Sequence, residues 1–77
     1  MLSKFPRISL KRTGQNIHRL MREHDLSVKD VQEAFGFEYP QAVYKWIRGE
    51  SLPTVDNLVV LALLFKTTID KIVVIED

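Results

Sequence analysis

Residues 41–48 carry side chains that could recognise a nucleic acid. In a helix over this stretch, Val43, Trp46 and Ile47 would share one apolar side. The opposite side would present an amide, a methyl group, a phenol and two cations, but no carboxylate: Gln41, Ala42, Tyr44, Lys45 and Arg48. In the major groove of DNA, amides bond adenine, methyl groups contact thymine, and cations reach guanine or phosphate. The pattern therefore favours a DNA-reading helix over an ordinary solvated helix face.

A first short helix, over 28–35, would precede and support this stretch. Ser27 and Asp30 fit a capping box at its start, in which the hydroxyl and the carboxylate each accept a backbone N–H. Gly36 follows it, as expected where a helix ends in a left-handed residue. Gln32 lies on the otherwise apolar stripe of this helix. We expect its side chain to bond a neighbouring backbone group at the edge of the core.

A turn with two polar candidates leads into the second helix, over 40–48. Pro40 can open that helix, since the first helical position has no intrahelical use for an N–H; Gly49 would close it. In the turn, Glu38 could accept a hydrogen bond from cytosine, or it could stabilise the helix through the helix dipole. Tyr39 could bond a phosphate or simply cover the turn.

The spacing resembles a helix-turn-helix of the phage-repressor type, the XRE or lambda-repressor-like family. The matching positions are Ser27, Gly36, Val43, Trp46, Gly49 and Pro53, with Ile17 and Leu20 upstream. The likeness covers roughly residues 13–73 and implies an all-α bundle of five helices that binds operator DNA. The chain departs from the usual pattern in a turn that is one residue longer, and in Gln32, where an alanine is usual.

In such a fold the start of the second motif helix points into the groove. Gln41 and Ala42 lie in its first turn, and Lys45 lies one turn further along the same face, so we assign base reading to these three residues. Phosphate contacts set register rather than sequence. The candidates for them are Ser27, Lys29, Tyr39, Tyr44, Arg48 and Asn16.

The rest of the chain is expected to complete one domain over residues 13–77, behind an N-terminal arm over residues 1–12. The expected helices beyond the motif run over 13–24, 55–66 and 69–73, and their caps are Thr13, Thr54 and Thr68. In the first of them, Ile17, Leu20 and Met21 would face inward. These helices and the two of the motif would make a five-helix bundle, and the resemblance implies that it is lambda-repressor-like.

The helix over 55–66 is apolar on nearly every side. One stripe could fill the core: Val55, Leu58, Leu61, Ala62 and Phe65. A helix that is apolar all round should be buried on both sides. The second side could be covered by a second copy of the chain, or by the chain's own ends, where Ile8 and Leu10 alternate and residues 72–75 are β-branched. These ends could pair as a small two-stranded sheet. In a homodimer the expected interface residues are Val59, Val60, Leu63, Leu64 and Val74.

Composition excludes several other classes of protein. The 77 residues allow one small domain, and without cysteine there is neither a disulfide framework nor a thiolate metal site. The longest apolar run, Leu58 to Phe65, is far shorter than the roughly 20 residues of a membrane span, so we expect a cytoplasmic protein. His18 and His24 have no ligand at metal spacing, and no nucleophile motif or phosphate loop is present. We expect no enzyme, no cofactor, no metal and no small-molecule ligand.

These features favour sequence-specific binding of double-stranded DNA by a transcription regulator, with repression as the expected role. The regulator would act as a homodimer on a palindromic operator. Six of the eleven Lys and Arg residues lie in residues 1–24, although the net charge is only +1. The alternative is a protein-interaction module, such as an antitoxin-like partner, that keeps the same bundle without reading DNA. The low net charge and the acidic segment 25–38 favour that alternative.

Overall fold

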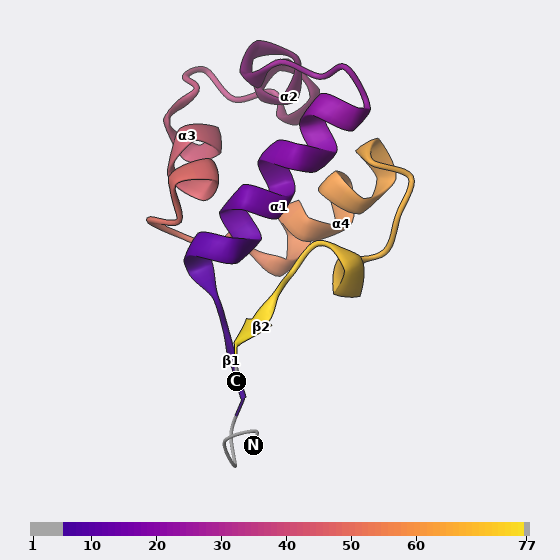
Figure 1. Cartoon of the computed structure of the whole chain (residues 1–77). Helices are drawn as coiled ribbons and strands as arrows, with labels where there is room; N and C mark the ends of the chain where they lie inside the picture. The colour runs from indigo at the N-terminus through magenta and orange to yellow at the C-terminus, as the bar shows by residue number, and fades with distance from the viewer. Residues whose placement is uncertain (1–5, 77) are drawn as a thin grey trace.

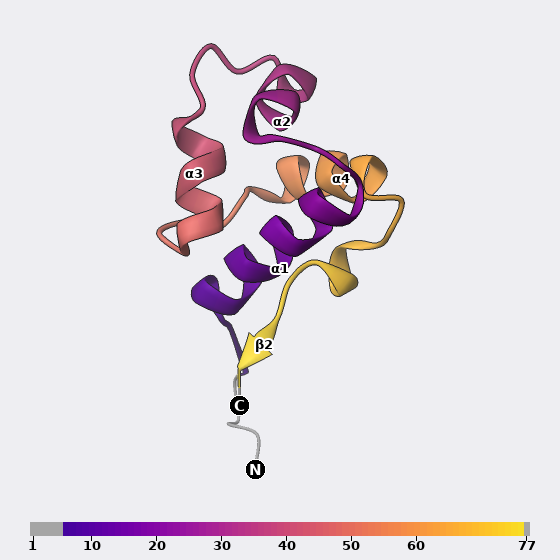
Figure 2. The same cartoon turned by 45° about the horizontal axis from the view of Figure 1, so that its top comes forward.

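The described residues form four α-helices around one core, with a short two-stranded sheet at one end (Figures 1 and 2). The computed structural model describes residues 6–76. The elements in chain order are β1 (Arg7–Ile8), α1 (Leu10–Glu23), α2 (Val28–Phe35), α3 (Gln41–Arg48), α4 (Val55–Leu64), the 3-10 turn η1 (Ile69–Lys71) and β2 (Ile75–Glu76). Figure 1 shows α1 in the middle of the molecule, with α3 to its left and the C-terminal segment to its lower right. This is a helix-turn-helix fold, as predicted.

The two motif helices begin and end close to the predicted positions. The Oγ of Ser27 accepts the N–H of Asp30 at 3.0 Å, and the Asp30 carboxylate accepts the N–H of Ser27 at 2.9 Å, so the capping box is present. Gly36 ends α2 with a φ of 70°, and Gly49 ends α3 with a φ of 76°; both lie in the left-handed region that favours glycine. Pro40 stands one residue outside α3, as its N-cap.

α1 begins three residues earlier than predicted. Its N-cap is Ser9, whose Oγ accepts the N–H of Arg12 at 3.1 Å, and the prediction of Thr13 as the cap is wrong. Thr13 lies inside the helix, only 1% exposed, and its hydroxyl accepts the N–H of Val74 at 2.9 Å. A partner so distant in the chain leaves no local signal. The end of the predicted arm therefore belongs to β1 and α1, while residues 1–5 lie outside the described part.

The predicted fifth helix over 69–73 is wrong as well. Residues 69–71 make a single 3-10 turn, and Thr68 forms no side-chain cap hydrogen bond. The β-branched residues that follow favour extended structure, and β2 pairs antiparallel with β1, with Arg7 opposite Glu76 and Ile8 opposite Ile75. The predicted pairing of the chain ends is confirmed, although Leu10 belongs to α1.

The core lies where the four helices and the C-terminal segment meet. Its most deeply buried apolar side chains are Ile17, Met21, Val31, Val43, Leu61, Phe65 and Ile72. α1 and α3 approach each other very closely at Gly14, where a Cβ atom would lie 2.2 Å from the carbonyl oxygen of Trp46 and 2.6 Å from that of Ile47. Only glycine fits there, so this contact sets how closely α3 lies against α1.

α4 faces the core with Leu58 and Leu61, and Phe65 follows them. The prediction that Val55 belongs to this stripe is wrong, because Val55 lies about 90° round the helix from the core side and is 71% exposed. The other side of α4, which faces away from the core, is not covered by the ends of the described chain. Figures 1 and 2 show the two-stranded sheet extending beyond the helices, and Val59 and Leu63 are 46% and 74% exposed within residues 6–76.

Candidate nucleic-acid interface

α3 turns its polar side to solvent. Val43 and Trp46 are 0% and 4% exposed, which directs the opposite side of the helix outward. The exposed residues there are Gln41, Tyr44, Lys45 and Arg48. Ala42 is half-buried and packs against the core, so its methyl group is less available to a thymine than predicted. The exposed face nevertheless keeps its hydrogen-bonding and cationic character and bears no carboxylate.

Arg48, at the end of this face, already has a carboxylate neighbour. Its Nε donates to the Glu50 carboxylate at 2.5 Å, and its guanidinium lies 6.0 Å from the centre of the Tyr44 ring. Both partners of the ion pair are about half exposed, and ion pairs in such surroundings contribute little stability. A phosphate can therefore replace Glu50 as the partner of Arg48 at small cost.

The turn before α3 is held from two sides. The Gln32 amide donates to the carbonyl oxygens of Phe37 at 3.2 Å and Glu38 at 3.1 Å, which confirms the expectation that it bonds neighbouring backbone. The Phe37 ring stacks on Phe35 at 5.0 Å and meets the edge of Trp46 at 6.0 Å. Tyr39 lies between these held residues and α3, and its side chain is 63% exposed.

The start of α2 combines free donors with one negative charge. The N–H groups of Ser27 and Asp30 are both used in the capping box, so the first-turn donors that remain are those of Val28 and Lys29. Hydrogen bonds from the Ser27 backbone N–H, and then from its side chain, hold the pKa of Asp30 below its ordinary value. Lys29, which is exposed, adds a cation beside this carboxylate. A phosphate here would meet Lys29 and the free N–H groups.

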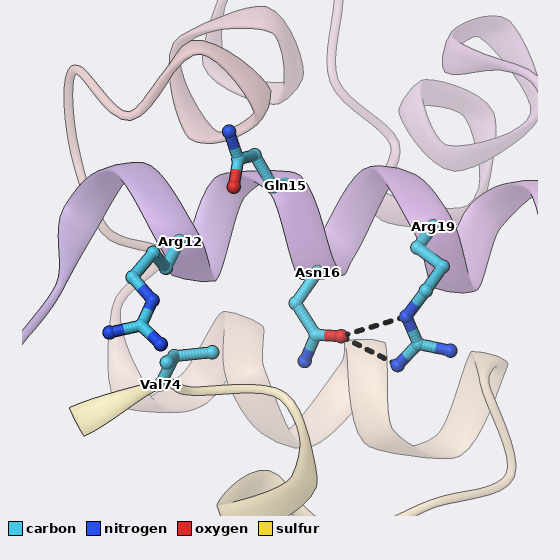
Figure 3. A pocket seen from close by; sticks show the side chains of 5 residues that line it. All are labelled: Arg12, Gln15, Asn16, Arg19 and Val74. Atoms are coloured by element: carbon cyan, nitrogen blue, oxygen red, sulfur yellow. Dashed lines mark hydrogen bonds between the residues drawn. The ribbon is translucent and has the colours of Figure 1, made fainter. Parts of the chain in front are cut away.

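Asn16 is tied to the protein's own backbone. Its Nδ2 donates to the carbonyl oxygens of Lys71 at 2.8 Å and Ile72 at 2.9 Å, while its Oδ1 accepts from Arg19. Figure 3 shows Arg12, Asn16 and Arg19 on the same side of α1, at a shallow pocket of about 330 Å³. Both N–H groups of the Asn16 amide are occupied, so the side chain has a structural role here; its predicted phosphate contact stays untested.

Two residues that position α3 have a local signal in the sequence. Gly14 stands inside a helical pattern, where a glycine costs about 1 kcal/mol relative to alanine, and in the structure it allows the close contact with α3. The place of Gln32 on an apolar stripe predicts a bond to backbone, but it does not predict that this backbone is the turn leading into α3. Neither residue lies on the exposed face of α3.

Among residues 6–76, no group of three or more His, Asp and Glu side chains lies together as metal ligands would. None of the helices in this part of the chain combines the length and the apolar character needed to cross a membrane.

The fold and the exposed face of α3 together define a helix-turn-helix domain, a class of DNA-binding transcription regulators. A family model described as "Helix-turn-helix" matches residues 17–72, from the middle of α1 to just beyond η1. The chain belongs to this helix-turn-helix family, which is of the XRE type, and the resemblance seen in the sequence is confirmed. No curated protein and no solved structure matches the chain.

Proposed function

We propose that this protein binds double-stranded DNA sequence-specifically and represses transcription as a homodimer on a palindromic operator, without enzymatic activity. The observation that carries the proposal is the exposed, carboxylate-free face of α3. Gln41 stands at the start of that face and Lys45 lies one turn further on, so both can reach base edges when α3 enters the major groove. We propose repression because a protein bound at an operator excludes other proteins from the same stretch of DNA.

The phosphate contacts would surround this reading face. Arg48 lies at the end of α3, Tyr44 lies in the middle of the helix, Tyr39 precedes it, and Lys29 lies at the start of α2. Each of these four side chains is exposed. Because cations on phosphates release counterions, affinity should fall steeply as salt is raised.

The exposed side of α4 supports the homodimer. Val55, Val59 and Leu63 follow one another at intervals of four residues and form an apolar stripe, which we call the α4 stripe; their exposures are 71%, 46% and 74%. Of the interface residues predicted from the sequence, Val59 and Leu63 lie on this stripe. The others are half-buried, and Leu64 packs against the core. The proposed interface therefore keeps Val59 and Leu63 and gains Val55.

A twofold axis suits the order of side chains along the α4 stripe. With Val59 on the axis of two antiparallel copies of α4, Val55 of one subunit faces Leu63 of the other. The same patch on both subunits is what a twofold interface requires, and the two copies of α3 could then reach half-sites about 34 Å apart.

Selection of bound sites from random duplexes tests the DNA-binding proposal. The expected result is one motif with twofold symmetry, whose binding weakens steeply between about 50 and 200 mM salt. Failure to bind any duplex at micromolar protein and low salt would overturn the proposal and favour the protein-interaction module. A motif without twofold symmetry would contradict the palindromic operator alone.

Replacement of Leu63 by Glu tests the dimer. In light scattering coupled to size-exclusion chromatography, the wild-type protein should have the mass of two chains, and Leu63→Glu that of one. The matched control is Ile75→Glu, since Ile75 is an exposed apolar residue on β2, 48% exposed and outside the α4 stripe. The control should remain dimeric. A monomeric Ile75→Glu protein together with a dimeric Leu63→Glu protein would move the interface from α4 to the two-stranded sheet.

A further inference from the structure

The turn over residues 36–40 is held by a side chain of α2. It joins the two motif helices without regular structure of its own, and its first N–H groups bond back to α2, from Gly36 to Glu33 and from Phe37 to Gln32. The next two carbonyl groups, those of Phe37 and Glu38, both accept hydrogen bonds from the Nε2 atom of Gln32. One side chain therefore holds two successive peptide groups of the turn.

The apolar contacts of the turn fix it in a second direction. The ring of Phe37 lies nearly parallel to that of Phe35, with an interplanar angle of 14°, and nearly edge-on to Trp46, at 66°. Phe35 belongs to α2 and Trp46 to α3, so the ring of Phe37 joins the two helices. The turn is thus held by a polar anchor, Gln32, and by an aromatic anchor, Phe37.

These anchors end immediately before the residues that would read DNA. Glu38 is the last residue held by Gln32, and only Tyr39 and Pro40 separate it from Gln41. Resting on the proposed function, we propose that Gln32 is a positioning residue for sequence reading: it fixes the turn so that Gln41 meets the DNA in one defined geometry. Gln32 itself does not touch DNA, because its amide is engaged with the turn.

Sequence preference and overall affinity for DNA should depend on the Gln32 hydrogen bonds to different degrees. A hydrogen bond to a base needs a donor–acceptor distance of about 2.7–3.2 Å and a good angle, so small movements of the turn weaken it. A cation beside a phosphate tolerates such movement. Arg48 also lies at the far end of α3, next to Gly49 and Glu50, where the turn has little influence. Loss of the Gln32 hydrogen bonds should therefore reduce sequence preference more than total affinity.

Replacement of Gln32 by Met tests the proposal, because Met keeps the length of the side chain and removes both N–H donors. The two probes are the duplex selected by the wild-type protein and a scrambled duplex of the same composition. For Gln32→Met the ratio of the two affinities should fall by roughly tenfold, the size of one base contact, with the scrambled duplex bound as before. Amide hydrogen exchange in residues 37–39 should become faster.

Two further variants serve as comparisons for Gln32→Met. Gln15→Met makes the same substitution at an exposed residue of α1 whose side chain has no hydrogen bond in the described part of the structure, and it should leave the ratio unchanged. Gln32→Glu keeps the shape but sets a negative charge against two carbonyl oxygens, and it should lower the ratio further than Met does.

Three outcomes are distinguishable. If the wild-type protein selects no motif, the proposed function fails before the role of Gln32 is reached. If the wild-type protein selects a motif and Gln32→Met binds the selected and the scrambled duplex as tightly as the wild type does, the positioning role is overturned. The role is also overturned if Gln32→Met binds both duplexes more weakly by the same factor, in step with a lower melting temperature, since that result describes a purely structural residue.

Discussion

α3 and α4 are successive helices of similar length, 8 and 10 residues, and each leaves one side uncovered by the rest of the described chain. The uncovered side of α3 is polar and cationic, with Gln41 and Lys45 exposed, whereas that of α4 carries Val59 and Leu63. Polar side chains keep their hydration until a ligand with matching donors and acceptors displaces it. Apolar side chains gain from any contact that removes water.

The contrast separates two kinds of recognition in one small domain. α3 has the composition of a surface that chooses among ligands by hydrogen-bond pattern, as DNA grooves require. The α4 stripe has the composition of a surface that is stably covered by another protein surface. Changes on one helix should therefore alter DNA reading without altering assembly, and changes on the other should do the reverse. Leu63→Glu tests the α4 half of that separation, and the following predictions concern α3 and the elements that support it.

The largest effect is expected from Gly14→Ala, which acts on the position of α3. In an ordinary helix interior this substitution stabilises a protein by about 1 kcal/mol. Here the added methyl group would lie 2.2 Å from the Trp46 carbonyl oxygen, a backbone atom that cannot turn aside. The free energy of unfolding should fall by about 3 kcal/mol or more, as measured by urea denaturation.

Gln15→Ala is the control for Gly14→Ala, since it makes a helix-neutral change at the next, exposed position. It should leave the free energy of unfolding within about 0.5 kcal/mol of the wild-type value. A Gly14→Ala protein that is as stable as the wild type would show that α3 can move away from α1 freely, and the argument for a fixed reading helix would fail.

The next effect is that of Gln41→Ala on the polar face of α3. Loss of a two-pronged contact to a base should cost about 1–3 kcal/mol of binding free energy on the selected duplex and relax the preference at one base pair. Binding to scrambled duplex and the dimer mass should not change. Equal losses on selected and scrambled duplexes would refute the role of Gln41 as a base reader.

The two helices also differ in how far the sequence alone predicts them. In α3, apolar residues recur at the helical period on one side and polar residues on the other. This spacing is enough to assign the inward side and to predict that Gln41 and Lys45 are exposed. In α4 nearly every residue is apolar, and periodicity cannot say which side faces the core. The pattern therefore places Val55 in the core, although it is 71% exposed; the actual choice depends on how α4 packs against the rest of the fold.

Long-range hydrogen bonds set the other limit of what the sequence predicts. The capping box of Ser27 and Asp30 spans three residues and is visible in the sequence, and the structure contains it. The same kind of local rule predicts Thr13 as a helix cap. Its hydroxyl bonds Val74 instead, 61 residues away, and Asn16 likewise bonds Lys71 and Ile72. Such partners are brought together only by the fold.

A smaller effect of opposite sign is expected from Glu50→Gln at the end of α3. The substitution removes a carboxylate that pairs with Arg48 at 2.5 Å and that would repel phosphates. Because an exposed ion pair of this kind is worth about 0.2–1 kcal/mol, affinity for selected and scrambled duplexes alike should rise by roughly two- to fivefold. Fluorescence anisotropy at fixed salt measures both affinities.

Asp70→Asn is the matched control for Glu50→Gln, since it removes one negative charge from η1, outside the motif helices. It should raise affinity less than Glu50→Gln does. Equal gains from the two variants would mean that only net charge matters and that Arg48 is not a phosphate contact.

The smallest expected effect is a difference in acid sensitivity between the N-terminal caps of α2 and α4. The start of α2 depends on the ionised Asp30, whose pKa lies below its ordinary value because of the hydrogen bonds from Ser27. A group with a lowered pKa in the folded state stabilises that state above its unfolded pKa, and the contribution is lost as pH falls through the folded pKa. α4 starts instead with the neutral hydroxyl of Thr54, which accepts the N–H of Asn57 at 3.3 Å. Acid should therefore loosen α2 before α4.

Amide hydrogen exchange can detect this order. As the pH is lowered through the titration of Asp30, protection of the Ser27 and Asp30 amides should fall relative to that of the Asn57 amide, and the Asp30→Asn protein should lack this step. A parallel loss at both helix starts would indicate global acid unfolding and would contradict a separate role for the capping box. Such a fall in protection at α2 alone would show that the start of α2, next to the proposed DNA-reading helix, depends on the charge of the Asp30 carboxylate. α4 has a neutral cap, so the α4 stripe should keep its geometry over the same pH range.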